Sequence, residues 1–381
     1  MNISSFRPAA LSWLMAPALA GGLLLSSCNS QPTTTETGQP ATDPTTNAPA
    51  SGSTGSVTPT GAKPAWGPNL GPEMQAVIEQ LISFNNKPLP ELTAVQARKQ
   101  PSPADAAMKQ MRASNITPPP MQADTVNRTL VPGVTGRIYT PKTGTAPYPV
   151  IVYYHGGGWV IATIDTYHSS AQALAEKTGA VVVSVEYRKG PENKFPTAHD
   201  DAFAAYQWAL KNAASIKGDP NRVAVAGESA GGGLAAAVSM MARDRKVALP
   251  KYQLLVYPIA GSATNTPSYQ ANTETAPLNK AGMEWFFKNY LRTPADGQDP
   301  RVNLVAANLK GLPPTTIIAA EYDPLTSEGK TLADNLQAAG VKVNYKLYEG
   351  TTHEFFGMAG VVPQADAAQA VATDDLKNAL K

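Results

Sequence analysis

Ser229 stands in the segment of the chain with the clearest chemical pattern. The sequence there reads Gly227-Glu228-Ser229-Ala230-Gly231-Gly232, after the apolar run Arg222–Ala226 and before an Ala-rich helical stretch. A G-x-S-x-G pattern between a strand and a helix is typical of a strained turn that presents a serine hydroxyl, with glycines that let strand and helix approach closely. The pattern alone also fits an ordinary turn, but its context predicts that Ser229 is a nucleophile.

A second glycine-rich segment, His155-Gly-Gly-Gly-Trp159, directly follows the apolar run Val150–Tyr154. Successive glycines let the backbone point N–H groups at the negative charge that develops on an attacked carbonyl oxygen, and losing one such donor costs about 3–4 kcal/mol. The alternative is a flexible loop without this role. We predict that the oxyanion hole uses the N–H groups of Gly156, Gly157, Gly158 and Ala230.

A serine nucleophile needs a base, and the chain has four histidines. His353 follows the last predicted strand, as the chain order of serine, acid and histidine requires on such a sheet. We expect His155 to orient the glycine loop rather than move a proton. His199 lies at a predicted helix start, where a capping or surface role is expected, and His168 is expected to be structural or to line the site.

The acid that orients the base is predicted to be Asp323. It comes just after the apolar run Thr315–Ala320, so the strand end presents it towards His353, where it can fix the imidazole tautomer and stabilise the imidazolium. Glu321 is the nearest competitor, but it is expected within the end of the strand.

Short apolar runs alternate with helical stretches over most of the chain. The runs lack strict polar alternation, which is typical of parallel strands buried on both faces. They are Val150–Tyr154, Ala180–Val185, Val223–Ala226, Gln253–Tyr257, Thr315–Ala320 and Val343–Tyr348. The helical stretches are Ser169–Lys177, Asp200–Asn212, Gly233–Arg243 and Ser327–Ala339. The alternation predicts an α/β fold with an open, mostly parallel sheet and helices on both faces, preceded by a hairpin around Pro132-Gly133.

Two regions fall outside this alternation. Helical patterning over Glu73–Phe84 and Asp105–Met111 precedes every predicted strand, and a long interval after Tyr257 contains the amphipathic stretch Lys280–Leu291. We expect this interval to be an insertion above the sheet.

Four motifs resemble those of the hormone-sensitive lipase family of α/β-hydrolases, the bacterial family IV esterases. They are His155–Trp159, Gly227–Gly232, Asp323-Pro324-Leu325 and His353-Glu354-Phe355. The resemblance implies an α/β-hydrolase domain over 66–381, with a catalytic triad and a helical cap from about 66–120 and 258–295. The sequence departs from the family at Glu228, where the family usually has Asp.

The first 27 residues are typical of an export signal, with one charge at Arg7 and an apolar run over Ala9–Leu25. The segment Leu25-Ser26-Ser27-Cys28 resembles the lipobox of bacterial lipoproteins, and Cys28 is the only cysteine. We therefore predict a lipoprotein signal peptide over 1–27 and a lipid-anchored protein of the bacterial cell envelope. Asn29 is not the Asp that resembles an inner-membrane retention signal, which favours the outer membrane. The alternative is an uncleaved transmembrane anchor.

Residues 28–65 are rich in Thr and Pro and nearly free of large aliphatic side chains. Such a stretch buries too little surface to offset its chain entropy, which predicts a disordered tether behind the lipidated cysteine. The whole chain has a net charge of +2 and only 16% charged residues, so it lacks the basic surface of a nucleic-acid binder. A single cysteine also excludes a multi-thiolate metal site.

These patterns predict a serine carboxylesterase that cleaves a small-molecule ester through an acyl-enzyme intermediate, with neither metal nor organic cofactor. The resemblance to the hormone-sensitive lipase family implies short to medium acyl esters as substrates. Two alternatives remain open. The same triad suits a peptidase or amidase, and a silent member of the fold could hold an apolar ligand as a non-catalytic lipoprotein. The sequence makes no prediction of the oligomeric state.

Overall fold

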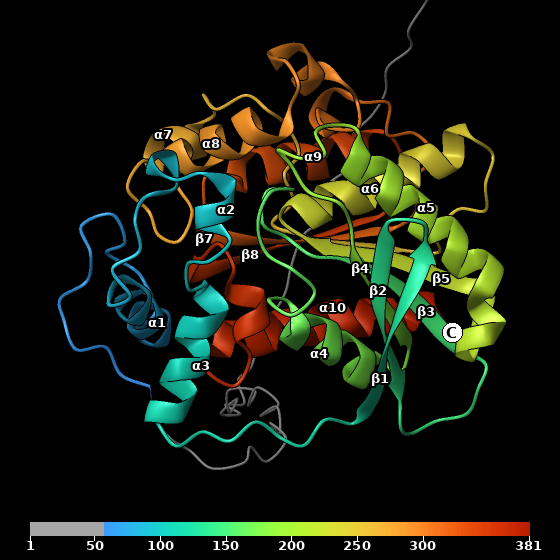
Figure 1. The fold of residues 1–381 in the computed structure, drawn as a ribbon, viewed down its shortest axis with the longest axis horizontal. Helices are drawn as coiled ribbons and strands as arrows, with labels where there is room; N and C mark the ends of the chain where they lie inside the picture. Colours follow the sequence, from blue (N-terminus) through green and yellow to red (C-terminus); the bar gives the residue numbers. More distant parts are fainter. Residues whose placement is uncertain (1–56) are drawn as a thin grey trace, which may run out of the picture. The chain divides into compact units, whose positions relative to one another are not determined.

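The computed structural model describes residues 57–381, and its strands form one eight-stranded sheet (Figure 1). The strand order is β1-β2-β4-β3-β5-β6-β7-β8. The strands are β1 (Ala123–Val131), β2 (Val134–Pro141), β3 (Tyr148–Tyr154), β4 (Val181–Glu186), β5 (Gly218–Glu228), β6 (Gln253–Val256), β7 (Thr315–Tyr322) and β8 (Val343–Thr352). Strand β2 pairs antiparallel with β1 and with β4, and all other neighbours are parallel. The α/β fold with a mostly parallel sheet is therefore confirmed.

Helices cover both faces of this sheet (Figure 1). One face carries α5 (Thr197–Asn212), α6 (Ala230–Asp244) and α9 (Thr326–Ala338). The other carries α4 (His168–Thr178) and α10 (Pro363–Ala379). The last of these, α10, has no counterpart among the helices expected from the sequence.

Strand β3 shows why the predicted strands lack polar alternation. Val150 and Val152 belong to the core beneath α5 and α6, whereas Ile151 and Tyr153 belong to the core beneath α4 and α10. Successive side chains of a strand point to opposite faces, and here both faces are covered. An apolar residue is therefore needed at every position.

The remaining helices lie in the two segments expected to form a cap. They are α1 (Pro72–Ile82), α2 (Ala94–Ala97), α3 (Pro103–Ala113), α7 (Pro267–Ala271) and α8 (Lys280–Tyr290), with short 3₁₀ turns at Leu89–Glu91 and Pro294–Gln298. A further 3₁₀ turn, Leu304–Ala306, follows the second of these segments. Two more 3₁₀ turns follow α5 and β8, at Ala213–Ile216 and Phe355–Met358. The indole N–H of Trp285 on α8 donates to the carbonyl of Leu92 at 3.0 Å. The two segments are thus in direct contact, although they lie far apart in the sequence.

The hairpin is present as predicted, with β1 and β2 joined at Pro132-Gly133, where Gly133 has φ 81°. A left-handed backbone of this kind favours glycine, which explains the turn pair. None of the helices within residues 57–381 combines the length and the apolar character needed to cross a membrane.

The amino-terminal predictions fall largely outside the described residues, including the signal peptide over 1–27 and Cys28. Residues 57–65 are described, however, and they belong to the predicted tether. Val57 is buried, and the carboxylate of Glu79 on α1 accepts hydrogen bonds from the amide and the hydroxyl of Thr60, both at 2.7 Å, and from Gly61 N–H at 3.0 Å. For this stretch the expectation of disorder is wrong. It has few apolar side chains to bury, but its hydrogen bonds to Glu79 hold it against α1.

Glu79 provides a test of this docking. Burial raises the pKa of its carboxyl, but the hydrogen bonds from Thr60, Gln75 and Gly61 outweigh burial and bring the pKa to about 2. The charge of Glu79 therefore stabilises the fold above its unfolded-state pKa of 4.5, and this contribution is lost as the pH falls towards 2. At pH 7, Glu79→Gln should lower the free energy of unfolding by about 1 kcal/mol in urea and speed amide hydrogen exchange at Thr60 and Gly61.

The matched control is Glu73→Gln on the same helix, which should leave exchange at these two amides unchanged. Equal exchange in both variants and the wild type would contradict the docking.

Candidate active site

Three predicted residues lie at one edge of the sheet, because each follows the carboxyl end of a parallel strand. Ser229 follows β5, Asp323 comes directly after β7, and His353 comes directly after β8. Carboxyl ends of parallel strands meet at the same edge, where open α/β sheets place their sites. Ser229 and His353, which are 124 positions apart in the sequence, therefore become neighbours.

The three side chains form a continuous hydrogen-bonded chain. His353 Nε2 lies 2.9 Å from Ser229 Oγ, and His353 Nδ1 lies 2.6 Å from Asp323 Oδ2. The other oxygen, Asp323 Oδ1, accepts from Leu325 N–H at 2.9 Å, which fixes the orientation of the carboxylate. All three side chains are buried, so water does not compete for these bonds. The arrangement can pass a proton from the hydroxyl to the imidazole while the carboxylate holds the ring.

The charged groups around His353 raise its pKa, although burial of the ring acts in the opposite direction. Burial lowers the pKa of the imidazole, but the adjacent Asp323 carboxylate and, more weakly, two glutamates raise it, and the net shift is upward. A base must be neutral to accept a proton, so activity that depends on His353 rises as the pH increases through this raised pKa.

The turn at Ser229 is sterically possible only with the glycines on either side. Ser229 has φ 56° and ψ −119°, a conformation that L-residues rarely adopt. A Cβ added to Gly227 would lie 2.2 Å from the carbonyl oxygen of Gly231, and one added to Gly231 would lie 1.9 Å from that of Tyr154. The second contact brings the start of α6 against the end of β3, where the glycine loop begins.

The glycine loop has the backbone freedom expected of an oxyanion hole. Gly157 and Gly158 have φ values of 94° and 58°, and a Cβ on Gly158 would lie 2.2 Å from the Phe286 ring. Among the described residues, no protein group accepts a hydrogen bond from the amides of Gly156, Gly157 or Gly158. Ala230 is the first residue of α6, whose opening N–H groups also lack intrahelical partners. The four predicted donors are thus free to bind a substrate oxygen.

His155 packs under this loop and keeps its ring inside the protein. The ring is fully buried, stacks on Tyr187 with centroids 4.3 Å apart, and its Nδ1 lies 2.7 Å from Gly156 O. The Tyr187 hydroxyl donates to the carbonyl of His155 at 2.8 Å. Burial lowers the pKa of His155 to about 4, so the ring is neutral at pH 7. These contacts support an orienting role for His155.

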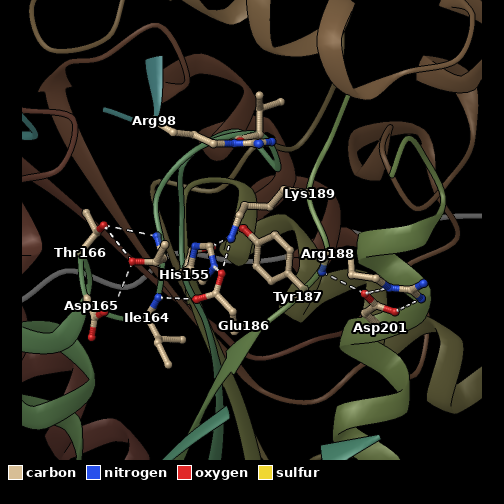
Figure 2. A network of polar contacts seen from close by, with 12 residues as sticks. Arg98, His155, Ile164, Asp165, Thr166, Glu186, Tyr187, Arg188, Lys189 and Asp201 are labelled. Carbon is tan, nitrogen blue, oxygen red and sulfur yellow. Dashed lines mark hydrogen bonds and ion pairs between the residues drawn. The ribbon is translucent and has the colours of Figure 1, made fainter. Parts of the chain in front are cut away.

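A network of charged side chains surrounds His155 (Figure 2). The Glu186 carboxylate accepts from Ile164 N–H at 2.8 Å, pairs with Lys189 and lies 4.0 Å from His155 Nε2. Nearby, Asp201 accepts two hydrogen bonds from the Arg188 guanidinium, at 2.9 and 2.6 Å (Figure 2). Glu186 thus links the segment after the glycine loop to Lys189, whereas Asp201 holds Arg188 against α5.

Arg98, just after α2, joins the cap segment to the loop, and sequence reasoning missed it. Its Nε donates a hydrogen bond to Val160 O at 2.8 Å, and its Nη2 donates one to Gly190 O at 2.6 Å. The same guanidinium forms an ion pair with the Glu192 carboxylate at 2.7 Å. Two of its acceptors are backbone carbonyls distant in sequence, so no motif could have identified them.

Two other expectations have different outcomes. His199 was expected in a capping or surface role, and that is wrong. The helix starts at Thr197, and the ring of His199 is buried between the Tyr290 hydroxyl, 2.7 Å from Nδ1, and Arg301 O, 3.2 Å from Nε2. Glu321 lies within the end of β7 as expected, where its carboxylate accepts from Gly350 N–H at 2.7 Å.

A pocket adjoins the glycine loop and the His353 loop. It is lined by the start of α3, by residues 161–170, and by Gly157, Glu228 and Glu354. Glu228 is 1% exposed, and its two oxygens accept from the hydroxyls of Tyr153 and Tyr257 at 2.6 and 2.5 Å. Burial raises its pKa to about 7. The sequence left the role of Glu228 open, and it gave no signal for the two tyrosines.

Comparison with known proteins places these features among ester hydrolases. Residues 151–357 match the family described as having the alpha/beta hydrolase fold. The carboxylesterase NlhH of Mycobacterium tuberculosis is 38% identical over 252 residues, which cover 64% of this chain and 78% of that protein. An ethyl acetate hydrolase of Pseudomonas putida is 34% identical over 232 residues, covering 60% of this chain and 73% of that protein. The solved structure of a hyperthermophilic esterase from Pyrobaculum calidifontis has a TM-score of 0.73 at 32% identity and covers 81% of this chain and 98% of its own.

The geometry predicts how Ser229 reacts with a fluorophosphonate, which modifies only an activated serine. Asp323→Asn removes the charge that holds the His353 tautomer and should slow labelling by about 10³–10⁴-fold. Glu321→Gln alters the competing acid near the same strand end and should leave the rate within about twofold of the wild type. The labelling rates can be followed by intact-protein mass spectrometry. A large loss of rate in Glu321→Gln with little change in Asp323→Asn would make Glu321, and not Asp323, the acid that orients His353.

Proposed function

Because the chain belongs to the α/β-hydrolase family, in its hormone-sensitive lipase-like group of esterases, it is a carboxylic-ester hydrolase, and we propose that Ser229, His353 and Asp323 carry the reaction. The observation that supports this assignment most strongly is the unbroken chain from Ser229 Oγ through His353 to Asp323. The substrate is a small ester, as for the esterases to which the chain is similar.

The first half of the proposed reaction acylates Ser229. The hydroxyl oxygen attacks the ester carbonyl carbon while its proton moves to His353 Nε2, and the carbonyl oxygen becomes an oxyanion. The free amides of Gly157, Gly158 and Ala230 stabilise that charge. The intermediate then collapses, the bond to the alcohol oxygen breaks, and His353 gives its proton to the leaving alcohol.

The second half restores the enzyme with one water molecule. His353 takes a proton from water, the hydroxide oxygen attacks the acyl carbon, and the bond to Ser229 Oγ breaks. The proton on His353 returns to Ser229, and the carboxylic acid leaves. Asp323 stays ionised throughout and stabilises the imidazolium in both halves.

We place the selectivity for short to medium acyl chains in the cap, built from about 66–120 and 258–295. Phe286 on α8 abuts Gly158, and Pro103 at the start of α3 lines the pocket beside Gly157. Both cap segments therefore reach the glycine loop, where they limit the room for an acyl or alcohol group. A side chain as large as Phe286 at this point favours small substrates.

We propose further that the chain is a lipoprotein of the bacterial outer membrane, in which Cys28 is diacylated and becomes the new amino terminus when residues 1–27 are removed. The support is the position of the only cysteine at the end of an apolar export signal. Several acyl chains on one residue anchor a protein stably, whereas one chain is marginal.

Ester hydrolysis and its chain-length preference can be measured with p-nitrophenyl esters from acetate to palmitate. We expect kcat/KM to be highest for short or medium chains, and Ser229→Ala to lower kcat by at least about 10³-fold. A panel of p-nitroanilide amides should be cleaved far more slowly than the esters. Equal rates for the wild type and Ser229→Ala would remove Ser229 from the mechanism, and a preference for the amides would favour a peptidase.

The anchor is tested with the full chain expressed in a bacterium that matures lipoproteins, using metabolic labelling with palmitate. The wild type should be labelled and fractionate with the outer membrane, and Cys28→Ser should be unlabelled. Asn29→Asp keeps the cysteine and should move the labelled protein towards the inner membrane. Label that persists in Cys28→Ser would contradict acylation at this residue.

A further inference from the structure

Glu354 follows the proposed catalytic histidine and turns its carboxylate back towards the ring. Its Oε1 lies 3.9 Å from His353 Nε2, the same nitrogen that faces Ser229 Oγ. The backbone of Glu354 has φ 74°, an uncommon left-handed conformation for a residue with a side chain. The Tyr167 hydroxyl donates to Oε1 at 2.5 Å and holds the carboxylate in this place.

Glu228 forms the other side of the same cluster. Through its oxygen Oε2 it binds the hydroxyl of Tyr257, whose ring lies against the His353 imidazole with centroids 4.5 Å apart. Its other oxygen binds Tyr153. The acids Asp323, Glu354 and Glu228 act electrostatically on His353, and the Tyr257 ring lies against it. The phenols of Tyr153 and Tyr167 reach this cluster through the two glutamates, as donors to Glu228 and Glu354.

In the part of the chain that the structure describes, no basic side chain balances the two glutamates. Within residues 57–381, neither Glu228 nor Glu354 forms a hydrogen bond or ion pair with a lysine or arginine. Burial raises the pKa of both carboxyls, because a buried charge without a partner is costly. The cation available to them is the imidazolium that His353 becomes when it takes the proton of Ser229.

We propose that Glu354 is a second acid of the catalytic histidine, so that the imidazolium formed during ester cleavage lies between Asp323 at Nδ1 and Glu354 beside Nε2. This inference rests on the hydrolysis by Ser229 proposed above. Glu354 takes no proton and forms no bond. It stabilises the charge on the ring electrostatically, and the attraction is weakly screened because the cluster is largely removed from water.

The pocket adds a link to the substrate. The side chain of Glu354 is 21% exposed, and Glu354 lines the pocket beside Gly157. A substrate group that fills this pocket displaces the water that screens Glu354. The stabilisation of the imidazolium is therefore greatest when the site is occupied.

The experiment compares the wild type with Glu354→Gln and Glu354→Asp across pH, using p-nitrophenyl butyrate read at the isosbestic wavelength of the phenol. Glu354→Gln keeps an oxygen that can accept from Tyr167 but removes the charge. We expect kcat to fall on the order of tenfold with little change in KM, and the acidic limb of kcat/KM to move to lower pH, because the pKa of His353 falls by about one unit. Glu354→Asp retains the charge and should recover part of both effects.

The matched control is Glu321→Gln, which removes a carboxylate near the same sheet edge and should leave the pH profile unchanged. A second readout is the pKa of His353 itself, followed by NMR titration of its ring in the wild type and in Glu354→Gln. An unchanged His353 pKa in Glu354→Gln, or equal losses in the Gln and Asp variants with an unshifted acidic limb, overturns the proposal. Because the titration needs no turnover, it shows whether Glu354 raises the pKa of His353 even if the wild type cleaves no ester. A wild type that cleaves no ester would refute the proposed function instead.

Discussion

The close approach of β5, α6 and the end of β3 is the constraint on which the site depends. Ser229 can sit at its strained φ only because Gly227 and Gly231 leave no side chain between strand and helix. The carbonyl of Tyr154 occupies the space that a Cβ on Gly231 would need, so the turn at Ser229 and the start of the glycine loop are packed as one unit. The position of Ser229 Oγ relative to the free amides is therefore set by backbone contacts, which adjust little when side chains change.

This backbone unit is completed by polar groups that the sheet brings to the same edge. His353 and Asp323 arrive from β8 and β7, and the raised pKa of His353 shows that the nearby acids outweigh the effect of burial. Arg98 and the network around Glu186 hold the outer side of the glycine loop (Figure 2). In the proposed reaction, the histidine that becomes charged therefore lies among buried acids, and the loop that carries the proposed oxyanion donors is held on both sides.

The sequence was sufficient for the parts of this arrangement that local patterns encode. The buried strands, the hairpin at Pro132-Gly133 and the placement of Ser229, Asp323 and His353 after strands all follow from short-range signals, and the structure brings these three residues together. The contacts of Arg98 and the buried position of His199 were missed because their partners are distant in sequence. The start of the folded domain was placed too late, because the segment around Thr60 has few apolar side chains and is held instead by hydrogen bonds to Glu79.

The central claim, that hydrolysis proceeds through an acyl group on Ser229, is tested most directly by rapid quenching in acid during turnover of an activated ester, followed by peptide mass spectrometry. The account predicts a peptide carrying the acyl mass on Ser229 that forms before the steady state and disappears when the substrate is exhausted. An enzyme that releases the full yield of alcohol and acid with no acyl group on Ser229 at any time, or with the acyl group on another residue, would contradict it.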